Sequence, residues 1–90
     1  MSDLRLLSRI AKGDAAAMRE LTDRLEATLY AIAYGILFDQ DAADQVVRSV
    51  MRRAWREAHY LARAVVPIRR WLARTTRQLA MERASEDAEA

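Results

Sequence analysis

Residues 41–55, DAADQVVRSVMRRAW, decide the fold because they carry two incompatible helical faces. Arg48, Arg52 and Arg56 recur at every fourth position and form a polar stripe. Asp41 is the predicted N-cap of this helix. Apolar residues recur at three- and four-residue spacing, as on the buried side of an amphipathic helix: Val46, Val47, Val50, Met51, Ala54 and Ala58. The apolar face predicts burial, and the polar face is where a function has to be sought.

The flanking sequence predicts three further helices joined by short connections. The first ends at Lys12-Gly13-Asp14, where glycine suits the left-handed position after a helix and aspartate suits the next N-cap. Pro67 suits the first turn of the last helix. We therefore expect an all-α, compact four-helix domain, with helices at approximately 3–11, 15–38, 41–61 and 67–84.

Two details of this pattern carry expectations of their own. Gly35 lies inside the second predicted helix and weakens it by about 1 kcal/mol relative to alanine, so we expect close packing by a neighbour there. After the helical domain of residues 1–84, residues 85–90 are small and acidic. We expect this segment to be a disordered tail.

Composition bounds the class of protein. Ninety residues, 52% of them hydrophobic, make one domain with a single modest core. There are no cysteines, which excludes disulfides and thiolate metal sites. The apolar run 29–38 is too short to cross a bilayer, and no signal peptide is present. The sequence therefore predicts a cytoplasmic protein without a membrane partner.

Charge is distributed unevenly along the chain. Residues 1–47 carry five basic and eight acidic side chains, a net charge of −3, whereas residues 48–83 carry ten arginines and two glutamates, a net charge of +8. Fourteen of the fifteen basic residues are arginine, whose planar fork suits phosphate and carboxylate. The second half therefore indicates a polyanion or an acidic protein surface as partner. A merely solvated arginine-rich face remains the alternative at this point.

Catalytic chemistry has little support in the residues. His59 is the sole histidine, and no glycine-rich phosphate loop is present. Asp41 and Asp44 are better explained as helix-start residues than as an acid and base pair. Trp55 and Trp71 are most simply core anchors. We expect neither an enzyme nor a bound cofactor or metal.

Four segments taken together resemble a known family. They are LLSRIAKGDAAAMREL (6–21), LYAIAYGIL (29–37), DAADQVVRSVMRRAW (41–55) and IRRWLARTTRQLA (68–80). In this order they resemble the second conserved region of extracytoplasmic-function sigma factors, and the match covers roughly residues 4–83. The resemblance implies a transcription initiation domain that docks on the beta-prime clamp helices of RNA polymerase core, recognises the minus-ten promoter element and traps unstacked bases of the non-template strand.

The resemblance also assigns residues to two surfaces. The polymerase-facing residues would be Asp44, Gln45, Arg48, Ser49 and Arg52. The promoter-facing residues would be Arg63, Arg69, Arg70, Arg74, Arg77 and Gln78. An arginine stripe supplies phosphate neutralisation, and an adjacent loop can hold an unstacked base.

This sequence departs from the family on the polymerase-facing surface. The family's third helix usually has Glu-Asp and then Gln-Glu where this chain has Asp44-Gln45 and Arg48-Ser49. A second hypothesis therefore stands beside the first. It is a sigma-like interaction module that binds an anti-sigma factor or another protein without opening promoter DNA.

Overall fold

The computed structural model describes residues 2–89, which form five α-helices and no strand. The helices are α1 (Asp3–Ala11), α2 (Ala15–Leu37), α3 (Gln40–Arg56), α4 (Ala58–Arg63) and α5 (Ile68–Glu89). None of the helices within residues 2–89 has both the length and the apolar character that crossing a bilayer requires. The prediction of an all-helical domain is confirmed.

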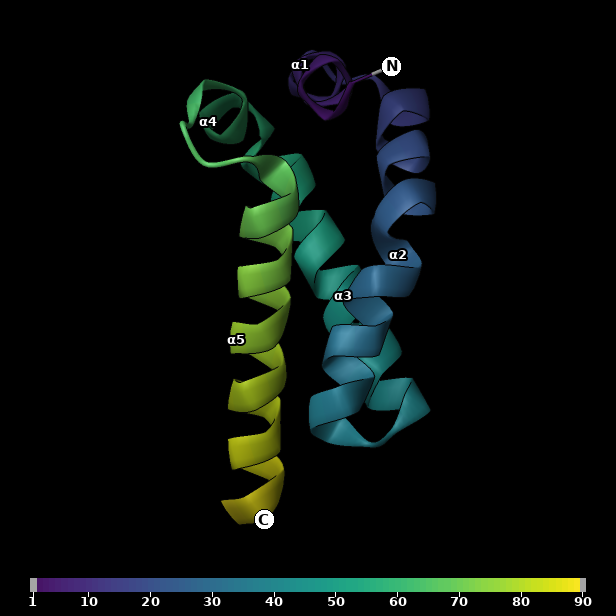
Figure 1. Cartoon of the computed structure of the whole chain (residues 1–90), viewed down its shortest axis with the longest axis vertical. Coiled ribbons are helices and arrows are strands. Elements are labelled where there is room, and N and C mark those ends of the chain that lie inside the picture. The colour runs from purple at the N-terminus through teal and green to yellow at the C-terminus, as the bar shows by residue number, and fades with distance from the viewer. Residues whose placement is uncertain (1, 90) are drawn as a thin grey trace.

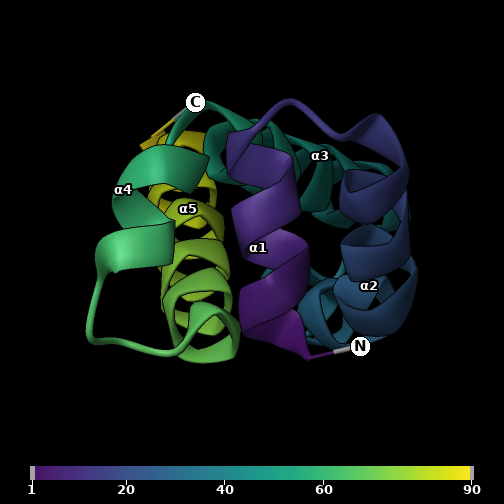
Figure 2. The same ribbon diagram turned by 90° about the horizontal axis from the view of Figure 1, so that it is seen from above.

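Three long helices run along the molecule, and two short helices cover one end (Figure 1). The chain runs along α2, returns along α3 and runs again in the first direction along α5. Across the end where α3 finishes and α5 begins, α1 and α4 lie side by side (Figure 2). The molecule measures 40 × 21 × 18 Å, and α5 projects beyond the turn between α2 and α3.

The core lies where α2, α3 and α5 meet and continues beneath α1 and α4. Its larger side chains are Leu6, Leu7, Ile10, Leu21, Leu25, Leu29, Val46, Val47, Val50, Met51, Leu61, Ile68 and Leu72. Its small side chains include Ala17, Ala33, Ala43, Ala54 and Ala80. Because interaxial distance depends on the side chains at the contact, these alanines let the long helices approach closely.

The described residues form five helices rather than the expected four, because the helix predicted to reach residue 61 is broken. Glu57 leaves helical geometry at φ −100° and ψ 13°, its N–H still bonds Arg53 O, and α4 begins at the next residue. The break turns α4 to lie beside α1, where Ala58 and Leu61 are buried. A separate α4 thus covers the end of the core.

The start of α3 also differs from the prediction. Asp39, rather than Asp41, is the N-cap, and its carboxylate accepts the Ala42 N–H at 2.8 Å. Phe38 adopts the left-handed conformation at φ 52° and ends α2, so Asp39 caps the next helix without an intervening loop. Asp41 lies in the first turn of α3, where the helix dipole favours a carboxylate.

The acidic end of the chain is helical in place of the expected disordered tail. The last helix continues through residues 85–89, whereas residue 90 lies outside the described residues. An ion pair between Arg83 and Asp87, 3.4 Å apart and one turn along the helix, supports this extension. Arg83 also donates to Gln45 of α3 at 3.0 Å, which ties the extended α5 to the bundle.

Gly35 has no close neighbour, contrary to the expectation. A Cβ built on Gly35 would meet nothing within 4 Å, and the residue is exposed in the helical part of α2. No packing requirement therefore accounts for this glycine.

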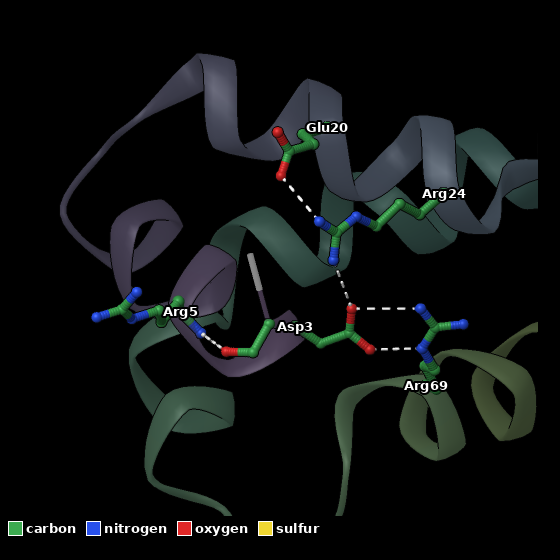
Figure 3. A network of polar contacts seen from close by, with 6 residues as sticks. Asp3, Arg5, Glu20, Arg24 and Arg69 are labelled. Carbon is green, nitrogen blue, oxygen red and sulfur yellow. Dashed lines mark hydrogen bonds and ion pairs between the residues drawn. The ribbon is translucent and has the colours of Figure 1, made fainter.

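A polar network fastens α1 to both α2 and α5 (Figure 3). The Asp3 carboxylate accepts hydrogen bonds from Arg69 Nε and from Arg69 Nη2, the second over 3.4 Å to Oδ1. Arg24 donates to the same carboxylate at 3.2 Å and to Glu20 at 3.2 Å. The hydrogen bond and positive charge of Arg69, with those of Arg24, hold the pKa of Asp3 below its ordinary value of 3.8, and the same contact raises the pKa of Arg69.

Replacement of Gly35 by alanine should stabilise the protein. The alanine fits the open helical position, so the free energy of unfolding should rise by about 0.5–1 kcal/mol in urea titrations. Gly13 is the matched control, because it stands at φ +87° and its replacement by alanine should lower stability instead. A loss of stability in Gly35→Ala would show that the position has a partner.

Replacement of Asp3 by asparagine should lower the free energy of unfolding at neutral pH by about 0.5–1 kcal/mol, the range for partly exposed ion pairs. Because folding lowers the pKa of Asp3, its contribution is complete above pH 3.8 and is lost as pH falls through the folded value. The gap between wild type and Asp3→Asn in thermal unfolding should therefore close below about pH 4. A gap that stays constant down to acid pH would contradict the network's role.

Candidate nucleic-acid interface

An uninterrupted arginine face runs along α5. Arg70, Arg74 and Arg77 follow one another at four- and three-residue spacing, which places them on one side of the helix. All three are exposed, and within residues 2–89 none of them has a carboxylate in ion-pair distance. This arginine face (Arg70, Arg74 and Arg77) therefore presents three positive charges that form no ion pair within the described chain.

Beside the arginine face, the surface of α5 is slightly hollowed. The hollow is lined by Arg74, Arg77, Gln78, Met81 and Glu82. Gln78 points along the helix and donates to Glu82 at 3.4 Å. Met81 is an exposed apolar side chain beside two cations, so this surface offers van der Waals contact as well as charge.

The two other predicted promoter-facing arginines lie elsewhere. Arg69 points towards α1 and is held by Asp3. Arg63 is exposed in the last turn of α4, on the far side of the 64–67 connection. The structure thus brings together Arg70, Arg74, Arg77 and Gln78, and separates Arg63 and Arg69 from that group.

Three of the predicted polymerase-facing residues line a groove between α2 and α3. Asp44 and Arg48 form an ion pair at 2.9 Å, and Arg52 donates to Ser49 Oγ at 3.1 Å. The apolar lining is contributed by Met18 of α2 and by Val47, Met51 and Trp55 of α3, with Thr22, Glu26, Asp44, Arg48 and Arg52 completing the groove. We call this the α2–α3 groove.

The other two residues predicted to face polymerase lie on the opposite side of α3. Gln45 and Ser49 line a smaller hollow between α3 and the end of α5. Gln45 Oε1 accepts from Arg83, so its side chain is already engaged within the fold. The five residues therefore divide between two sides of α3.

Of the two tryptophans expected as core anchors, Trp71 packs against the core and Trp55 does not. Trp55 is 40% exposed, because it follows buried Ala54 and lies at the edge of the apolar stripe of α3. Trp71 is half-buried against the core, and the Arg53 guanidinium carbon lies 5.7 Å from its ring centroid. That distance suits a cation–π contact.

The sequence reasoning missed the residues that hold Arg69 and Gln45 in place. Asp3 and Arg69 are 66 residues apart, Asp3 and Arg24 are 21 apart, and Gln45 and Arg83 are 38 apart. Local sequence spacing does not predict contacts over such separations. Within residues 2–89, no group of three histidine, cysteine or acidic side chains is arranged to hold a metal ion.

Comparison with known proteins adds no family: no protein-family model matches the sequence, and no solved structure matches the chain. The resemblance to sigma factors therefore rests on the sequence segments alone. The geometry described above is the independent basis for a proposed function.

Proposed function

We propose that this chain is a transcription initiation factor domain that binds RNA polymerase core and recognises and melts the minus-ten promoter element. The observation that carries the proposal is the exposed, uncompensated arginine face of α5. Arginines that bind phosphates release condensed counterions from nucleic acid, which makes such binding strong at low salt and weak at high salt.

A second feature of the same end of the molecule supports a single-stranded ligand. Between α1 and the connection that leads into α5 lies a hollow of about 260 Å³. Its lining is mainly apolar (Leu4, Leu7, Leu61, Ala64, Val65, Val66, Pro67 and Ile68), and the Asp3–Arg69 ion pair completes it. Apolar walls of this kind can receive a base that has left the stack. In this proposal the arginine face holds the strand's phosphates, and the hollow receives one base.

For polymerase, the proposal assigns the α2–α3 groove. Its Asp44–Arg48 pair and Arg52 offer polar contacts around an apolar floor, as protein interfaces commonly do. Gln45 and Ser49 face α5 instead, so they would contact the clamp helices only at the border of this surface.

The alternative is a sigma-like interaction module that engages an anti-sigma factor or another protein without melting DNA. This module would also use the α2–α3 groove, whose exposed Trp55 suits a protein partner because aromatic anchors dominate protein–protein binding energy. The two functions differ in whether the arginine face is needed. Promoter recognition requires it, and the interaction module does not.

The double variant Arg74→Ala/Arg77→Ala should bind a fluorescent single-stranded minus-ten oligonucleotide more weakly than wild type. The slope of log affinity against log salt should become shallower by about 1.4, because two phosphate contacts are lost and each contributes about 0.7 on a single strand. Thermal stability should change by less than about 0.5 kcal/mol, since both side chains are exposed.

Arg19→Ala is the matched control, because Arg19 is an exposed arginine of α2 without an ion pair in the described chain. It should leave oligonucleotide binding and its salt slope close to wild type. A loss in Arg19→Ala half as large as that in the double variant would mean that binding follows net charge alone, because the control removes one charge and the double variant removes two. Undiminished binding to polymerase core in the double variant, together with no oligonucleotide binding by wild type, would favour the interaction module.

A further inference from the structure

Three aromatic rings stand in a row at the end of α2. Tyr30, Tyr34 and Phe38 are spaced four residues apart, so they share one side of the helix. Tyr30 and Tyr34 are stacked, with ring centroids 5.9 Å apart and planes inclined by 14°. The rings of Tyr34 and Phe38 meet edge to face at 6.4 Å. We call these three residues the aromatic ladder.

The outer part of the aromatic ladder is exposed to a degree that the fold does not require. Phe38 is 76% exposed and Tyr34 is 39% exposed. Phe38 also has a left-handed backbone, at φ 52°. Glycine and asparagine adopt this conformation at a helix end with less strain than phenylalanine does. Neither burial nor backbone geometry therefore explains a phenylalanine at position 38.

The segment of chain that carries the aromatic ladder is acidic. Between Arg24 and Arg48 the chain has no basic residue and four acidic ones. Within residues 2–57, the acidic side chains without a recorded polar partner are Asp23, Glu26 and Asp41. Asp23 and Glu26 precede Tyr30 by seven and four residues on the same side of α2, and Asp41 lies just beyond Phe38.

We propose that the aromatic ladder and its three unpaired carboxylates form a docking surface for an arginine- or lysine-rich segment of a partner protein. The faces of exposed aromatic rings attract cations, and the planar guanidinium group stacks on them. The unpaired carboxylates add charge complementarity and steer the approach of a basic partner. The same carboxylates repel phosphates, so this surface does not suit a nucleic-acid strand.

This docking surface is distinct from the arginine face. Its residues belong to α2, to the turn after it and to the first turn of α3, whereas the residues of the arginine face belong to α5 (Figure 1). The inference therefore does not rest on promoter binding, and it remains testable if the chain binds no DNA.

The test uses the full chain and a fluorescein-labelled helical peptide with arginine and leucine on one face. Phe38→Asn should weaken peptide binding about tenfold in fluorescence anisotropy, because the most exposed ring is lost. Asparagine suits the left-handed position, so the melting temperature should not fall. Asp23→Asn/Glu26→Gln should also weaken binding and reduce its salt dependence.

Tyr60→Asn is the matched control, because Tyr60 is an exposed aromatic residue of α4, 70% accessible, outside the docking surface. It should bind the peptide as wild type does, and a peptide with glutamate in place of arginine should not bind. Equal binding by Phe38→Asn and wild type would overturn the proposal, as would tight binding of the glutamate peptide. Self-association of the chain that Phe38→Asn abolishes would also overturn it, because a second copy would then occupy the surface.

Discussion

The packing of α3 against both α2 and α5 is the constraint on which the rest of the structure depends. Its apolar stripe, from Val46 to Ala54, is buried between the two neighbours. Burying an unpaired guanidinium group would cost several kcal/mol, so the arginines at every fourth position must stay outside. Arg48, Arg52 and Arg56 are accordingly exposed, and the edge between stripe and arginines leaves Trp55 at the surface.

That constraint separates the molecule into surfaces of opposite sign. The arginines of the arginine face form no ion pair in the described chain, and the segment that carries the aromatic ladder has no basic residue between Arg24 and Arg48. Near neutral pH the two surfaces would attract different classes of partner. A net charge of +2 therefore says little about binding, because the local fields decide which molecule approaches which side.

Local patterns predicted most of the helices, and long-range contacts account for what they missed. Gly13 and Asp14 marked the α1–α2 junction correctly because a left-handed glycine and an N-cap are local features. The break at Glu57 escaped prediction because Ala54, Ala58 and Leu61 continue the helical period, with no glycine or proline between them. For the candidate site, spacing brought Arg70, Arg74 and Arg77 together, but it could not show that Arg69 is bound to a residue 66 positions away.

Because Asp3 binds Arg69, Arg69 is less available to an anion than the other arginines at the start of α5. A phosphate that approached Arg69 would have to displace a carboxylate that already satisfies two of its N–H groups. Arg70, Arg74 and Arg77 would give up only water and counterions. Because Asp3 also fastens α1 to α5, any anion that captured Arg69 would loosen the helix that covers the end of the core. Arg69 therefore belongs to the fold first, and any anion bound by α5 would meet the three arginines that form no ion pair within the described chain.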